Sequence, residues 1–69
     1  MKRQSVTSSN LASVGYDPAT QTLEIEFHHG GVYQYFDVPS SIYDGLVVAS
    51  SKGQYFAANI KGVYRYARV

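Results

Sequence analysis

Basic and tyrosine side chains, which are suited to bind phosphates and flat rings, are concentrated near the C-terminus. All five acidic residues lie before residue 45, whereas four of the six basic residues lie after residue 51. These basic residues are Lys52, Lys61, Arg65 and Arg68, and the tyrosines interleaved with them are Tyr55, Tyr64 and Tyr66. Cations attract phosphates, and aromatic rings stack on unpaired bases. The segment therefore indicates a surface for single-stranded nucleic acid.

The same residues also fit structural roles and a protein-binding role. Tyr55 and Tyr64 are suited to the core or its rim, and cations also solubilise a tail or complement the C-terminus of a helix. Residues 63–69 alternate between apolar and basic, which suits pairing along a sheet edge, and Tyr and Arg are favoured at protein interfaces. The salt dependence of binding distinguishes nucleic-acid binding from protein docking. Binding of phosphates through cations weakens steeply as the salt concentration rises, whereas an apolar docking surface is comparatively indifferent to salt.

No set of residues in the chain favours catalysis or a metal site. His28 and His29 are adjacent, and adjacent residues on a strand point to opposite faces, so they cannot chelate one ion together. Glu26 shares a face with His28, but the pair lacks a third ligand. The serines show no Gly-x-Ser-x-Gly motif, and Ser51-Lys52-Gly53 lacks the upstream glycine of a phosphate loop. We therefore expect no catalytic residue, metal or cofactor.

Length and composition indicate one small domain. A chain of 69 residues without cysteine forms a single core that is held by packing rather than by disulfides. The net charge of +1 and the pI near 8.0 are far from a strongly basic balance, so an anion-binding surface must be local. Residues 1–7 are expected to form a flexible N-terminal tail and residues 8–69 the domain. No apolar run follows the basic N-terminus, which predicts a cytoplasmic protein without a membrane segment.

Three segments are predicted to form an antiparallel meander. Residues 11–16 fit a short strand, and Asp17-Pro18 is a turn signal. Residues 22–28 show the clearest alternation of apolar and polar side chains, which predicts a half-buried strand. Gly30-Gly31 supplies the positive φ of a tight reversal, and residues 32–38 return as a third strand.

The length of the second turn decides which face Tyr33 and Tyr35 occupy, because a shift of one residue moves every side chain to the opposite face. A two-residue turn at Gly30-Gly31 leaves both tyrosines on the acidic face of the sheet. A turn with an odd number of residues directs them to the core, pairs Phe27 with Tyr33, and directs Gln34 to water. We favour the odd turn because it exposes the glutamine and gives both tyrosine rings a surface to cover.

Two short helices are predicted after the strands. The segment Val38-Pro39-Ser40-Ser41 is typical of a helix start, with proline in the first turn and either serine as the cap. Ser51 with Gln54 matches a capping box for a second helix, which Lys61-Gly62 closes. The expected fold is α+β, a three-stranded antiparallel meander followed by two short helices packed on one face (β-β-β-α-α). Residues 63–69 are expected to be either a short strand or an ordered tail.

One ordered set of residues runs through most of the chain, from about residue 8 to residue 64. Its members are Ser8-Ser9, Gly15-Tyr16-Asp17, Leu23, Ile25, Phe27, Gly30, Tyr33, Tyr35, Val38-Pro39, Tyr43, Leu46, Ala49, Ser51, Gly53, Tyr55-Phe56, Ile60 and Tyr64. In this order and spacing they resemble the KTSC domain, a short family that occurs free-standing in bacteria and phages. The family also occurs at the C-terminus of some lysyl-tRNA synthetases.

The resemblance implies a non-catalytic module, and RNA binding is the role suggested for the family. We therefore predict a small binding module for RNA, including tRNA, with no cofactor, metal or membrane partner. The alternative is a protein docking or self-association module with no nucleic-acid ligand. The predicted RNA-binding residues are Lys52, Lys61, Arg65 and Arg68 for phosphates, and Tyr66, Tyr33 and Tyr35 for stacking.

Overall fold

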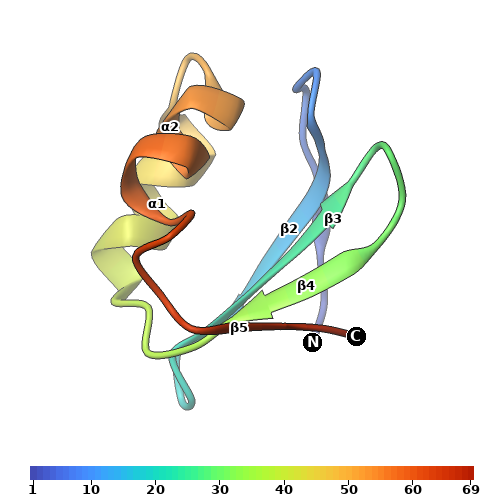
Figure 1. The fold of residues 1–69 in the computed structure, drawn as a ribbon. Helices are drawn as coiled ribbons and strands as arrows, with labels where there is room; N and C mark the ends of the chain where they lie inside the picture. The colour runs from blue at the N-terminus through green and yellow to red at the C-terminus, as the bar shows by residue number, and fades with distance from the viewer.

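The computed structural model describes all residues 1–69 and consists of one antiparallel sheet and two helices. The elements are β1 (Gln4–Ser5), β2 (Leu11–Asp17), β3 (Thr22–Phe27), β4 (Val32–Tyr35), α1 (Ser40–Val48), α2 (Lys52–Asn59) and β5 (Tyr66–Arg68). The strands lie in the order β1-β2-β3-β4-β5, and both helices lie on one face of the sheet (Figure 1). The predicted α+β class and helix pair are confirmed, and the C-terminal segment contains a strand.

The core lies between the helices and the face of the sheet that they cover. The alternation of β3 directs Leu23 and Ile25 to this face, and Leu46 of α1 and Phe56 of α2 meet them from the helices. The buried apolar residues are Leu11, Val14, Leu23, Ile25, Tyr35, Val38, Leu46, Phe56 and Ile60. Every helix and every strand from β2 to β4 contributes to this cluster, so the helices cannot leave the sheet without exposing it.

The prediction of three strands before the helices is wrong, because there are four. β1 pairs with β2, and Gln4 lies opposite Val14. Gly15 permits this close approach, because a Cβ there would lie 2.7 Å from the backbone oxygen of Lys2. Residues 1–7, expected to be a flexible tail, thus contain an edge strand. The division of the chain into a tail and a domain stays a prediction about mobility.

Tyr33 and Tyr35 face the helices, as the odd turn predicts. Ile25 lies opposite Tyr33, and Leu23 lies opposite Tyr35. Directly opposed residues of antiparallel strands share a face, so both tyrosines project toward the core. The predicted pairing of Phe27 with Tyr33 is wrong by two residues, because the turn closes between Phe27 and Gly31, one residue earlier than that pairing requires.

The turn spans residues 27–31. The amide of Phe27 donates to the carbonyl oxygen of Gly31 at 3.1 Å, and the amide of Gly30 donates to the carbonyl oxygen of Phe27 at 3.0 Å. Gly30 and Gly31 have φ values of 101° and 91°, which glycine adopts readily, so the predicted reversal at the glycine pair is confirmed. β4 ends at Tyr35 and is therefore shorter than predicted. Asp37 has a φ of 59°, which is not an extended conformation, so the strand cannot continue through it.

The two helices begin in different ways. α1 begins at Ser40 with Pro39 at the N-cap and no side-chain cap, so the predicted serine cap is wrong. α2 follows Ser51, whose hydroxyl accepts a hydrogen bond from the amide of Gln54 at 3.4 Å, so the Ser51 half of the predicted capping box is confirmed. Neither helix has the length and apolar character that a membrane span requires.

Candidate nucleic-acid interface

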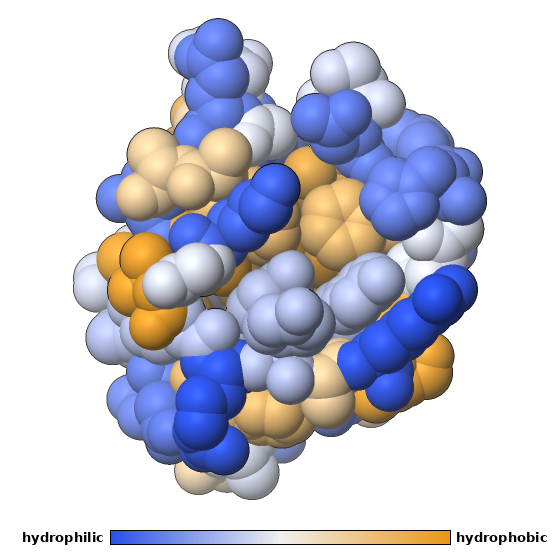
Figure 2. All heavy atoms as spheres, viewed as in Figure 1, coloured by the Kyte–Doolittle hydropathy of each residue, from blue (hydrophilic) through white to orange (hydrophobic).

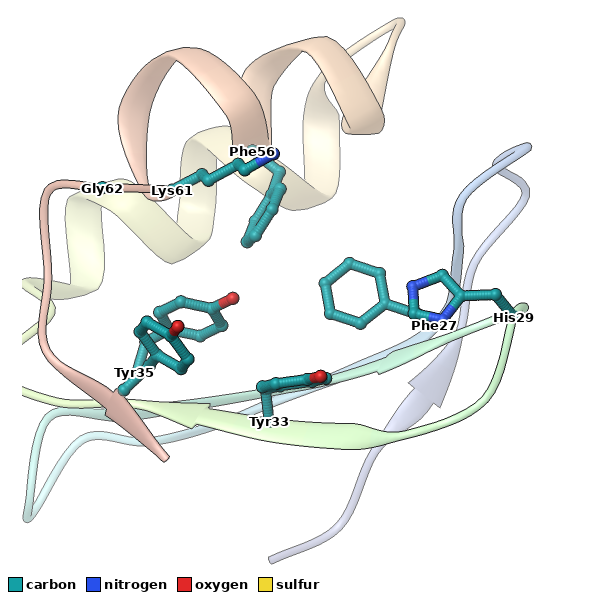
Figure 3. A pocket seen from close by; sticks show the side chains of 8 residues that line it. Phe27, His29, Tyr33, Tyr35, Phe56, Lys61 and Gly62 are labelled. Atoms are coloured by element: carbon teal, nitrogen blue, oxygen red, sulfur yellow. The ribbon is translucent and has the colours of Figure 1, made fainter. Parts of the chain in front are cut away.

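A groove lies between α2 and the helix-facing side of the sheet. It consists of two adjoining hollows of about 250 and 270 Å³. The first, here the tyrosine lobe, is lined by Phe27, His29, Tyr33, Tyr35, Phe56, Lys61, Gly62 and Tyr66 (Figure 3). The second, here the asparagine lobe, is lined by Asn10, Leu11, Phe27, His29, Gly53, Phe56, Ala57 and Lys61. The groove is therefore built from the start of β2, the ends of the β3–β4 hairpin, α2 and β5.

Phe27 is the centre of the aromatic packing in the groove. Its ring is stacked with that of His29, with centroids 5.3 Å apart and planes 11° apart. It meets Tyr33 and Phe56 edge-on, at 5.6 and 5.4 Å between centroids. Phe56 projects from α2 toward the sheet, whereas Phe27 and His29 lie side by side across the hollow (Figure 3). Because these rings hold one another in place, the walls of the groove are formed before any ligand arrives.

The three tyrosines of the tyrosine lobe differ in exposure. Tyr66 of β5 is 62% exposed and packs beside Tyr33 and Tyr35, with centroids 6.0 and 5.6 Å apart. Tyr35 is only 6% exposed, and its ring packs edge-on against Phe56. Burial, and secondarily the neighbouring tyrosines, raise the pKa of Tyr35 to about 12. Tyr66 therefore offers a ring face, whereas Tyr35 offers at most an edge and a hydroxyl that is protonated at neutral pH.

Two of the predicted cations lie at the groove, and its lining contains no carboxylate. Lys61 lines both lobes, and the guanidinium of Arg68 lies 5.8 Å from the centroid of the Tyr33 ring. Glu24 and Glu26 lie on the opposite face of the sheet, because they alternate along β3 with its core residues. Figure 2 shows apolar atoms in a hollow with strongly hydrophilic side chains around it. The groove thus combines aromatic walls with positive charge.

The other two predicted cations lie outside the groove and have partners of their own. Lys52 begins α2, and its ammonium donates to the carbonyl oxygen of Ala49, just beyond α1, at 3.1 Å. Arg65 pairs with Asp37 at 2.9 Å and lies 5.5 Å from the centroid of the Phe36 ring. The four cations therefore do not form one continuous surface, because Lys52 is at the opposite end of α2 from Lys61.

Sequence reasoning missed several residues of the groove. Phe27 and Phe56 occur at strand and helix spacing, and this spacing indicates core residues rather than the walls of a groove. His29 precedes the glycine pair of a turn, and only its position after an aromatic strand residue could have indicated a stacking role. Asn10 carries no signal at all, since it lies in a polar stretch and reaches the groove only through the fold.

Neither histidine belongs to a cluster of metal ligands. Nε2 of His28 lies 3.0 Å from the carbonyl oxygen of Ser8, and His29 is stacked on Phe27. Nowhere in residues 1–69 do three or more His, Cys, Asp or Glu side chains gather as a metal ion requires.

The opposite face of the sheet holds a buried carboxylate. Glu24 is 8% exposed and accepts hydrogen bonds from Gln34 at 2.9 Å and from Arg3, which reaches over from the N-terminal segment. Arg3 also donates to the hydroxyl of Ser13, which donates to Glu26. The hydrogen bond from Gln34 and the bond and charge of Arg3 lower the pKa of Glu24 below its ordinary value of 4.5, against the opposing effect of burial. Negative charge is thus held away from the groove.

The fold and the groove define a small α+β module in which a helix pair leaves an aromatic groove open beside a five-stranded sheet. The chain belongs to the KTSC domain family, whose model matches residues 7–69. The crystal structure of a KTSC domain protein from Yersinia pestis is similar over 99% of this chain and 96% of that one, at 41% identity and a TM-score of 0.97. The resemblance inferred from the sequence is confirmed.

Two further relatives differ in how much of their length this chain covers. A protein of Stutzerimonas stutzeri is 44% identical over 100% of this chain and 99% of its own length. A lysine–tRNA ligase of Nostoc sp. is 48% identical over 61 residues, which are 88% of this chain but only 11% of the ligase. A KTSC-like sequence therefore makes up nearly all of one relative and a small part of the other.

Proposed function

We propose that this protein is a non-catalytic module that binds single-stranded RNA, with tRNA as the leading ligand, in the groove between α2 and the sheet. One observation carries the proposal: an aromatic groove has Lys61 and Arg68 beside it and no acidic residue in its lining. Aromatic faces stack on unpaired bases, and each stacked base contributes about 1 to 3 kcal/mol. The cations attract the phosphates that join such bases.

The choice of tRNA rests on the similarity to lysine–tRNA ligase. That enzyme's name identifies tRNA as its substrate, and this chain resembles 11% of its length. A segment of that size is suited to an accessory contact with the substrate rather than to the reaction itself. A role beside tRNA also agrees with the cytoplasmic location expected from the sequence.

The proposal gives unequal roles to the seven residues predicted from the sequence. Lys61 and Arg68 contact phosphates, Tyr66 supplies the main stacking face, and Tyr33 and Tyr35 complete the lobe with a ring and a hydroxyl. Lys52 and Arg65 add only long-range attraction, because Lys52 contacts Ala49 at the far end of α2 and the carboxylate of Asp37 offsets the charge of Arg65. The two pairs of cations are therefore expected to differ in mutagenesis.

The test compares two double variants with the same change in charge. Lys61→Gln with Arg68→Gln should weaken binding of a single-stranded RNA about tenfold or more and should lower the salt slope by about 1 for each lost phosphate contact. Lys52→Gln with Arg65→Gln should change affinity less than about threefold. Binding would be followed by NMR titration at two salt concentrations, with the thermal midpoint measured in parallel.

The proposal predicts that amide shifts gather at the end of the β3–β4 hairpin, α2 and β5. Equal losses in the two double variants would mean that the RNA responds to net charge and not to the groove. The absence of shifts at low salt would end the RNA proposal. Because Lys61 and Arg68 are exposed, the thermal midpoint of their double variant should stay close to that of the natural protein.

A protein docking or self-association module is the second candidate, and β5 favours it. β5 pairs only with β4, so its other edge is unpaired in the sheet. Val63, Tyr66 and Val69, in and beside this strand, are each more than 60% exposed. Such docking should be nearly indifferent to salt and should appear as concentration-dependent mass in sedimentation, whereas RNA binding should weaken steeply with salt.

A further inference from the structure

The two lobes of the groove share one wall. Phe27, His29, Phe56 and Lys61 line both lobes, and the remaining residues line only one. The lobes have volumes of about 250 and 270 Å³. Each is smaller than the roughly 300 to 1,000 Å³ of a pocket for a whole small molecule. Each lobe is therefore suited to one ring system, and the pair is suited to two successive units of a chain.

The lobes differ in the chemistry that they offer to a ring. The tyrosine lobe presents the exposed face of Tyr66 and the protonated hydroxyl of Tyr35. The asparagine lobe is framed by Leu11, Gly53 and the amide side chain of Asn10, which donates and accepts hydrogen bonds. Stacking dominates in the first lobe, and hydrogen bonding to a base edge is available in the second.

We propose that the groove binds a two-nucleotide step of single-stranded RNA, with one base in each lobe and Lys61 at the phosphate that joins them. Lys61 is the only cation that lines both lobes, which places its charge where the linking phosphate of two lobe-bound bases must pass. Duplex RNA does not fit this arrangement, because its bases are paired and stacked on one another. The inference rests on the proposed function and adds to it the size and register of the ligand.

Gly53 gives a way to narrow one lobe and leave the other unchanged. A Cβ at Gly53 would lie 2.9 Å from Nδ2 of Asn10, so alanine there pushes the asparagine side chain and reduces the space of its lobe. Gly53 lies within α2 and its φ is not positive, so alanine also favours the helix. The variant is therefore expected to fold and to lose only the asparagine lobe.

The experiment measures binding of adenosine monophosphate, the dinucleotide ApA, hexa-adenylate and a short RNA duplex at one low salt concentration. The monophosphate keeps a phosphate for Lys61, and this phosphate carries more negative charge than the diester of ApA. Tighter binding of ApA would therefore report the second base and not the phosphate. ApA should bind about tenfold more tightly than the monophosphate, which corresponds to about 1.4 kcal/mol and lies within the range for one further stacked base. Hexa-adenylate should gain less than a further fivefold, and the duplex should bind more weakly than ApA.

Three variants assign the bases to the lobes. Gly53→Ala should remove most of the advantage of ApA over the monophosphate and should change the affinity for the monophosphate less than twofold. Tyr66→Ala should weaken both ligands about tenfold. Gln54→Ala, an exposed neighbour in α2 that lines neither lobe, should leave both affinities unchanged.

The failure of this inference is distinguishable from the failure of the proposed function. Suppose that hexa-adenylate shifts the NMR signals of the groove residues but ApA binds no more tightly than the monophosphate. The two-base register is then wrong and RNA binding stands. The same holds if Gly53→Ala preserves their ratio, or if duplex binds as tightly as ApA. If none of the four ligands shifts the NMR signals of the groove residues at low salt, the RNA function and its two-base register are both overturned.

Discussion

Glu24 shows how one residue can be predicted in type and direction and still acquire an unexpected environment. Its place in the alternation of β3 correctly indicates that it points away from the core. The sequence does not reveal that Arg3 and Gln34 cover it, because Arg3 is distant in the chain and reaches Glu24 only through the pairing of β1. A buried carboxylate must be paired and hydrogen-bonded, and this network satisfies both needs.

Acid should therefore weaken the fold partly through Glu24. Because its folded pKa is below 4.5, the charged carboxylate stabilises the fold above that pH, and this contribution is lost as the pH falls through the lowered folded pKa. Glu24→Gln should lower the free energy of unfolding at pH 7 by about 2 kcal/mol. The loss relative to the natural protein should shrink below pH 4. Urea unfolding at pH 7, 4 and 3 measures both effects.

Asp44→Asn provides the control, because Asp44 is exposed and has no hydrogen-bond partner or ion pair among the side chains. It should change the stability at pH 7 by less than about 0.5 kcal/mol. A pH dependence that is identical in the natural protein and in Glu24→Gln would show that Glu24 does not contribute.

The residues of the candidate site also differ in how far the sequence predicts them. Lys61, Arg68 and Tyr66 were predicted from the sequence, and in the fold they remain exposed and near one another. Lys52 and Arg65 could not be set aside, since their partners come from a helix end and from a turn that meet them only after folding.

The packing of α1 against α2 depends on a glycine in a helix. The hydroxyl of Tyr55 in α2 donates to the carbonyl oxygen of Ile42 in α1 at 3.0 Å. A Cβ at Gly45 would lie 2.2 Å from that hydroxyl oxygen and 2.7 Å from the adjoining ring carbon. Gly45 therefore lowers the helix propensity of α1, and its missing side chain allows Tyr55 of α2 to approach α1 closely.

Gly45→Ala should destabilise the protein although alanine is the better helix former. The gain in helix propensity is about 1 kcal/mol, whereas displacing the Tyr55 ring and its hydrogen bond should cost more, for a net loss of about 1 to 2 kcal/mol. Thermal or urea unfolding measures the change. Gly53→Ala is the matched control, because it meets only the end of the Asn10 side chain and should be neutral or stabilising. A rise in the midpoint of Gly45→Ala would refute this account of the contact.

Elements with a strong local signal were predictable and elements without one were not. Residues that are adjacent in the sequence determine three of these features: the alternation of β3, the glycine pair of the turn and the Ser51 cap of α2. β1 contains only Gln4–Ser5, which show no apolar pattern, and its pairing depends on the missing side chain of Gly15. The pairing of β4 with β3 was two residues off because the hydrogen bond between Phe27 and Gly31 closes the turn one residue earlier than predicted, and the glycine pair alone does not fix that position.

At the scale of the whole molecule, the N-terminal segment links the edge of the sheet to its centre. Deletion of residues 1–5 should lower the free energy of unfolding by about 2 kcal/mol, because it removes β1 and leaves Glu24 without Arg3. That is a large share of the roughly 3 to 5 kcal/mol available to a domain of this size. Urea unfolding of the shortened chain measures the loss, and Lys2→Gln serves as a control.

The expectation of a flexible tail makes the opposite forecast for the same deletion. If residues 1–5 contribute nothing to stability, the unfolding midpoint of the shortened chain will match that of the full chain. RNA binding should survive the deletion in either case, because none of residues 1–5 lines the groove.

The crossing of Lys2 and Arg3 over Gly15 has a consequence for how such a module is mounted on a larger protein. These residues run across the side of the sheet that the helices do not cover. Any polypeptide fused ahead of Met1 would depart from that side, so its tether and the aromatic groove would have the sheet between them.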